Sequence, residues 1–132
     1  MLIVLGLVVG CSNPKITSIK LKKSPMIEIC FDEPIIHGSY EGEFIIKTKN
    51  GLIFTNKNRP KVIINTAFEK DPKCETFNPF LYLTNRWTSD NEWQHISKNL
   101  TWSNISSVTF ILYTSTWTGG LEKISEYTYR IE

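Results

Sequence analysis

The side chains that could carry acid–base or metal chemistry are few in this sequence and widely spaced. The two histidines, His37 and His95, lie outside any recognisable nucleophile or metal motif. Carboxylate pairs such as Asp32-Glu33 are typical of a solvated surface. No glycine-rich phosphate loop is present, and three isolated glycines have the context of turn residues: Gly38, Gly42 and Gly51. We therefore predict no enzymatic activity, no cofactor, no metal and no small-molecule substrate.

The first twelve residues, MLIVLGLVVGCS, place a thiol at the end of an uncharged apolar run. The segment Val8-Val9-Gly10-Cys11 resembles the lipobox of bacterial lipoproteins, in which the cysteine receives the lipid. A helix needs about 20 apolar residues to cross a bilayer, so this run is too short to span one. Its length is that of a signal-peptide hydrophobic region. The resemblance implies a signal peptide over residues 1–10 and a lipid on Cys11.

Two further points concern this segment. In the lipoproteins that this segment resembles, the residue after the cysteine sorts the protein between membranes. The resemblance implies that Ser12, unlike an Asp, directs the protein to the outer membrane with the domain facing the periplasm. A signal peptide normally opens with Lys or Arg, and Met1 is followed by Leu2. We therefore expect the true translation start to lie upstream. The alternative is a buried N-terminal strand with a core cysteine. Two features disfavour it: apolar and polar residues do not alternate in this segment, and the composition becomes polar abruptly at Ser12.

Assigning Cys11 to the lipid leaves Cys30 and Cys74, which we predict to form a disulfide in an oxidising periplasm. The alternative is two isolated buried thiols. Neither cysteine belongs to a recognisable zinc-ligand motif, so a zinc site is not expected.

The length of 132 residues, with 15 basic and 13 acidic residues, fits one domain with a net charge of +2. This charge is too small for a nucleic-acid-binding surface, so no nucleic acid is expected. We divide the chain into a signal peptide (1–10), a lipidated tether with the first strand (11–24) and a β-sandwich domain (25–132). The lysines near the anchor are typical of a solvated tether, and the alternative is that they attract anionic lipid head groups. They are Lys15, Lys20, Lys22 and Lys23.

Alternating apolar and polar residues, bounded by Pro, Gly and Asn turns, predict a chain of short strands. Asn50-Gly51 is the strongest hairpin signal. In no segment do apolar residues recur with the 3.6-residue period of a helix over the length of a helix. The expected fold is all-β, a small antiparallel sandwich of the immunoglobulin or transthyretin kind. The expected strands cover residues 15–23, 26–31, 40–49, 52–54, 61–68, 77–84, 107–116 and 122–132.

A long connection from Asn85 to Asn104 holds three of the four tryptophans. Long connections in compact domains are often functional, and Trp with Arg is enriched at protein-binding hot spots. We predict a partner-binding surface here. The alternative is that the indoles cover the open end of the core, and stacking on a cell-wall sugar is a third use. The candidate contact residues are Arg86, Trp87, Trp93, His95 and Trp102.

Several features together resemble one class of proteins. They are the lipobox, a strand ending at Cys30, the segment Asp71-Pro72-Lys73-Cys74, an aromatic strand after it and a C-terminal hairpin. This layout is similar to small periplasmic lipoproteins described as immunity proteins of type VI secretion systems. The resemblance implies a protein partner, a toxin that is bound and neutralised. The class has no common functional residues to carry over, so the resemblance covers only Cys11, Cys30 and Cys74. The missing basic start and the long tryptophan-rich connection depart from the pattern, which leaves the toxin-contact surface open.

Two other functions remain open from the sequence. One is a structural lipoprotein of an envelope or secretion complex, and the other is a module that binds cell-wall glycan or an outer-membrane protein. In each case the protein would reach the membrane through its lipid anchor.

Overall fold

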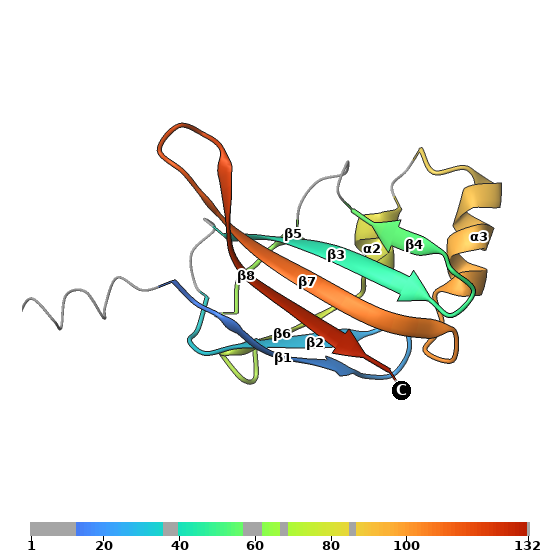
Figure 1. Cartoon of the computed structure of the whole chain (residues 1–132), viewed down its shortest axis with the longest axis horizontal. Helices are drawn as coiled ribbons and strands as arrows, with labels where there is room; N and C mark the ends of the chain where they lie inside the picture. The colour runs from blue at the N-terminus through green and yellow to red at the C-terminus, as the bar shows by residue number, and fades with distance from the viewer. Residues whose placement is uncertain (1–12, 36–39, 57–61, 67–68, 85–86, 132) are drawn as a thin grey trace, which may run out of the picture.

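The computed structural model describes residues 13–35, 40–56, 62–66, 69–84 and 87–131. Strands dominate and form two antiparallel sheets that pack face to face, which confirms the predicted all-β sandwich (Figure 1). Cys11, His37 and Arg86 lie outside the described residues.

The smaller sheet has three strands in the order β1-β2-β6. These strands are β1 (Ile16–Leu21), β2 (Ile27–Phe31) and β6 (Cys74–Phe77). Cys30 and Cys74 are direct partners across β2 and β6, with their Cα atoms 4.1 Å apart, and they form a disulfide. The predicted pair is confirmed. Because β1 pairs with β2, the first strand is part of the sandwich.

The larger sheet has five strands, in the order β4-β3-β7-β8 with β5 also paired to β3. The turn at Asn50-Gly51 joins β3 to β4 as predicted, with Gly51 at a φ of 88° that favours glycine. The strands are β3 (Tyr40–Thr48), β4 (Ile53–Thr55), β5 (Val62–Ile63), β7 (Ile105–Ser115) and β8 (Leu121–Arg130).

The core lies between the sheets and follows the strand alternation. Phe44, Phe110 and Phe77 form its aromatic centre, with ring centroids 4.9 to 5.8 Å apart. Gly42 lies inside β3, so its prediction as a turn residue was wrong. A Cβ atom there would come within 2.2 Å of the Phe110 ring, which is why the strand carries a glycine. Other fully buried members are Ile27, Ile29, Ile46, Ile64, Ile105, Val108 and Leu112.

The chain also contains a helix that the sequence analysis missed, α3 (Asp90–Asn99). Ser89 caps it by accepting a hydrogen bond from the backbone N–H of Glu92 at 3.1 Å, and this Ser-x-x-Glu spacing is a helix-start signal. Ile96 is its only buried residue among those described, and Leu100, which follows it, is also buried. The apolar stripe was therefore too narrow to predict a helix from periodicity.

The strand expected over residues 77–84 is also wrong in part, because β6 ends at Phe77 and α2 (Phe80–Leu83) follows. The Asn78 side chain accepts a hydrogen bond from the backbone N–H of Phe80 at 3.1 Å, and Pro79 adopts a helical conformation. Both residues favour a turn into a helix over a continued strand.

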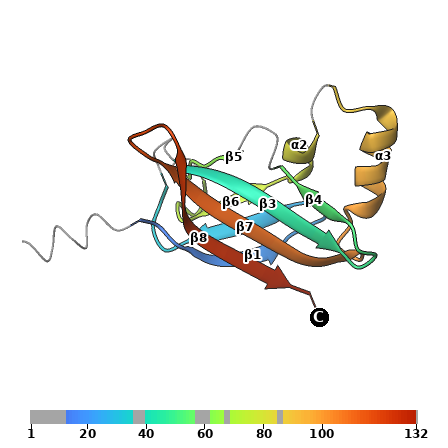
Figure 2. The same cartoon turned by 45° about the horizontal axis from the view of Figure 1, so that its top comes forward.

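Both helices lie at the β4 end of the sandwich, as two views show (Figure 2). Leu83, Ile96 and Leu100 join the core cluster there, so these segments cover one end of it.

Candidate functional site

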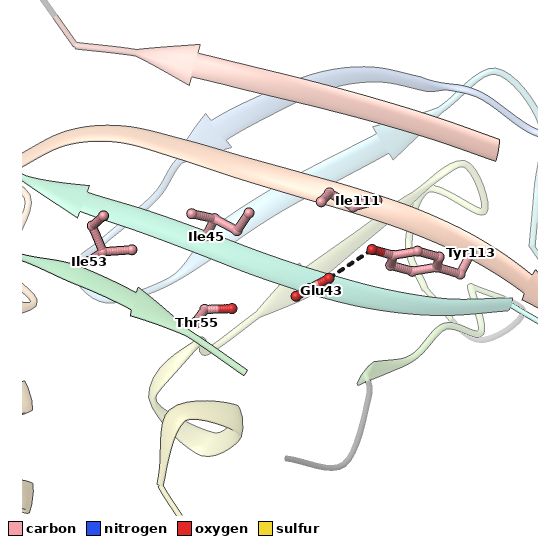
Figure 3. A pocket seen from close by; sticks show the side chains of 6 residues that line it. All are labelled: Glu43, Ile45, Ile53, Thr55, Ile111 and Tyr113. Atoms are coloured by element: carbon pink, nitrogen blue, oxygen red, sulfur yellow. Dashed lines mark hydrogen bonds between the residues drawn. The ribbon is translucent and has the colours of Figure 1, made fainter. Parts of the chain in front are cut away.

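The outer face of the larger sheet carries a shallow apolar hollow of about 320 Å³. Side chains alternate along a strand, so the neighbours of the core residues in β3 and β7 point to this face. Figure 3 shows three isoleucines across the hollow and a polar pair at one end. Its lining residues are Glu43, Ile45, Ile53, Thr55, Ile111 and Tyr113.

The polar pair joins Glu43 of β3 to Tyr113 of β7 (Figure 3). The Tyr113 hydroxyl donates to the carboxylate Oε2 of Glu43 at 2.8 Å, and Glu43 is only 5% exposed. Burial, together with this hydrogen bond and the carboxylate charge, raises the pKa of Tyr113 to about 12. At neutral pH the phenol therefore keeps its proton, and this end of the hollow stays hydrogen-bonded.

A second hollow of about 190 Å³ lies between β4 and α3. It shares Ile53 and Thr55 with the first, so the two hollows flank one strand. We use the name β4–α3 surface for the residues that line the two hollows together with the exposed Trp93 of α3. The second hollow is lined by Ile53, Phe54, Thr55, Leu83, Glu92, His95 and Ile96.

Two exposed apolar side chains belong to this surface. Ile53 is 61% exposed although it lies in a strand, and Trp93 of α3 is 48% exposed. The Trp93 ring meets Phe80 edge-on at a centroid distance of 4.8 Å, which holds the indole in place. The His95 ring lies 5.8 Å from the Phe54 ring. A positioned, exposed indole on the helix that borders a hollow lined by an exposed isoleucine is typical of a protein-binding surface.

The predicted contact residues are thus only partly brought together. Trp93 and His95 lie on the β4–α3 surface, and Trp87, 75% exposed, precedes α3 along the chain. Trp102 is elsewhere: its indole N–H donates to the backbone carbonyl of Lys22 at 2.7 Å, and its ring packs on the core. For Trp102 the structure supports the alternative, a cover over the core.

Removing the Trp102 side chain should therefore lower stability and leave binding intact. We expect Trp102→Ala to reduce the free energy of unfolding by about 2 kcal/mol through a partly collapsed cavity. Trp102→Phe keeps most of the ring and loses the N–H donor, so it should cost about 1 kcal/mol. Urea unfolding measures both values. Equal stability of Trp102→Ala and the wild type would contradict this role.

Sequence reasoning did not single out the three isoleucines of the first hollow or the exposed Trp117. Ile53 looked like a strand residue returning from the hairpin, and Ile45 and Ile111 looked like ordinary alternation. Trp117, fully exposed, lies at the projecting tip of the β7–β8 hairpin, beyond the sheets (Figure 1). Its position between two strands and before Gly119-Gly120 could have signalled an exposed turn.

A metal site is not supported by the candidate ligands. Within the described residues the one such group is Glu28, Cys30 and Cys74, with ligand atoms within 4.8 Å of one another. The two cysteines are joined as a disulfide, so neither offers a thiolate.

One carboxyl group of the smaller sheet has a strongly shifted pKa. Glu75 of β6 is half-buried and accepts a long hydrogen bond, 3.4 Å, from the backbone N–H of Asn65. Burial raises its pKa from 4.5 to about 7, and the charge of Glu69 adds to the rise while the Asn65 bond opposes it.

This shift predicts a pH dependence of stability. The folded state holds the Glu75 proton more tightly than the unfolded state, so its contribution is greatest below pH 4.5 and is lost as pH rises through 7. Glu75→Gln should therefore stabilise the protein at pH 8 by about 1 kcal/mol, allowing for partial exposure, and much less at pH 5. Melting temperatures at the two pH values test this. A larger effect of the substitution at pH 5 than at pH 8 would contradict it.

No family model, curated protein or solved structure matches this chain. Among the described residues, no helix is both long and apolar enough to cross a membrane.

Proposed function

We propose that this protein is a lipoprotein of the outer membrane that faces the periplasm and neutralises a toxin delivered by type VI secretion. The single observation that carries the binding part is the β4–α3 surface, where the exposed Ile53 lines both hollows and Trp93 is exposed on α3, the helix that borders the second hollow. Burying such side chains against a partner is favourable by roughly 1.5–3 kcal/mol for a large apolar group. The lipid anchor rests on the Val8-Val9-Gly10-Cys11 sequence.

A disulfide-linked sandwich suits this task. The disulfide joins β2 to β6 in the smaller sheet, and both hollows include residues of the larger sheet. The binding residues Ile53 and Trp93 are held by a β-ladder and by a ring contact respectively. A rigid surface loses little conformational freedom on binding, which favours affinity.

Capture of the partner tests this function. The full chain, purified with its anchor in detergent, would be used as bait for proteins secreted by a sister strain with an active type VI system. We expect one bound protein that is toxic when directed to the periplasm and harmless when this chain is co-produced. Recovery of envelope-machine subunits, or of glycan alone, would contradict neutralisation and support a structural or cell-wall-binding role.

The anchor gives a separate prediction. Cys11→Ser should abolish incorporation of labelled palmitate and remove the protein from outer-membrane fractions, because the thiol is the acceptor of the lipid. Ser12→Asp serves as a control that keeps the label and shifts the protein to the inner membrane. A Cys11→Ser protein that still carries palmitate would rule out this anchor.

A further inference from the structure

We propose that two copies of this chain associate through β8, which pairs antiparallel with β8 of the second copy about a two-fold axis at Thr128. The inference does not depend on the proposed function. β4 and β8 are opposite edges of the larger sheet, so the pairing leaves the β4–α3 surface exposed.

β8 is a long strand at the edge of the larger sheet, and β1 packs beside it without pairing with it. It ends the order β4-β3-β7-β8, and among the described residues no strand pairs with its far side. The hydrogen bond between β1 and β8 runs from the backbone N–H of Ile16 to the Ser125 hydroxyl at 3.0 Å, so it is not a ladder bond. An edge strand with free backbone groups is a template for a further strand.

The hydrogen-bond phase identifies which backbone groups face outward. Ile131 donates its N–H to the Ser106 carbonyl at 2.9 Å, on the β7 side. Along an antiparallel strand, the backbone N–H and C=O groups of successive residues point alternately to one side and the other. The backbone groups of Glu126, Thr128 and Arg130 therefore point away from β7. These three side chains are also exposed, on the same face of the sheet.

Charge then selects the register. In this register, Thr128 lies opposite Thr128 of the second copy. Glu126 of each strand then lies directly opposite Arg130 of the other strand, so the interface contains this pair twice. Pairs of opposite charge across two strands are favourable, and like charges opposite one another are not. A register centred on Glu126 or on Arg130 would place like charges together. The register at Thr128 is therefore self-complementary, as a two-fold interface requires.

The present partners of these charges leave them available. Glu126 pairs with Lys123 at 3.5 Å, and both side chains are about half exposed, so this ion pair is weak. Arg130 forms no ion pair within the described part of the chain. On the other face, the same register places Tyr127 opposite Tyr129 of the second copy. Both rings are already partly buried against the core, and aromatic pairs across strands add stability.

Cysteine cross-linking of the purified full chain tests the pairing. Thr128→Cys lies on the two-fold axis, so a short bis-maleimide should convert most of this variant to dimer. Glu122→Cys, exposed on the same strand but far from the axis, is the matched control and should give little dimer. Equal yields at the two positions would overturn the proposal.

Charge exchange on the Thr128→Cys background tests the register. Glu126→Arg and Arg130→Glu should each lower the dimer yield several-fold, and the double exchange should restore it. Melting temperatures verify that each variant is folded. If a charge variant does not fold, the comparison of Thr128→Cys with Glu122→Cys decides whether the two strands pair. Folded single variants that cross-link like the parent, or a folded double variant that is not restored, would overturn the register.

Discussion

Replacing Ile53 by aspartate should abolish partner binding while the protein stays folded. The side chain is 61% exposed, so a charge there costs little in the free chain. In a complex the carboxylate would be buried between two hollows without a partner, which is strongly unfavourable. Truncation of a central Trp typically costs 2 kcal/mol or more, roughly thirty-fold in affinity. We therefore expect at least this loss for Ile53→Asp and a similar one for Trp93→Ala.

Trp117→Ala is the matched control, because it removes an exposed indole at the hairpin tip instead of on the β4–α3 surface. Affinity would be measured by titration with the captured toxin, and melting temperature alongside it. Loss of affinity in Trp117→Ala alone would move the contact to the hairpin and contradict the β4–α3 surface. Unchanged affinity in both Ile53→Asp and Trp93→Ala would also contradict it.

Loss of the disulfide should have the largest effect on stability. The bridge closes a segment with a sequence separation of 44 residues, and the chain-entropy model gives about 4 kcal/mol for a loop of this length. That is a large share of the total stability of a small domain. We expect the double variant Cys30→Ala/Cys74→Ala to lose about 2–5 kcal/mol in urea unfolding.

The reduced wild type is the control for this experiment, since it breaks the same bond without changing side-chain volume. Its midpoint should fall close to that of the double variant. A double variant as stable as the oxidised protein, or free thiols at both positions in periplasmic material, would contradict the structural role of the bridge.

The strands could be predicted because each buries one face. In β7, Val108, Phe110 and Leu112 alternate with Thr109 and Ile111, and this period survives in the structure as buried and outer faces. The helix α3 could not be predicted by the same rule, because only Ile96 within it is buried. Its capping signal, Ser89 to Glu92, is local and lies in a mostly polar segment that also has the composition of a loop.

The candidate binding surface was predicted only in part, for a different physical reason. Trp93 and Trp102 lie nine positions apart in the same polar context, yet one is exposed and the other bonds to Lys22. That difference depends on which other segment each indole contacts, helix α2 for Trp93 and the residue after β1 for Trp102. Ile53 was missed because the sequence gives its strand and not the exposure of that strand at the edge of the sheet.

Survival in competition tests the central claim most directly. A strain lacking this gene would be mixed with its parent, which keeps an active type VI system, and the surviving cells would be counted. We expect the strain to die, to be rescued by the wild-type chain, and not to be rescued by Ile53→Asp/Trp93→Ala present at the same level. Survival without the gene, or full rescue by the double variant, would contradict neutralisation through the β4–α3 surface.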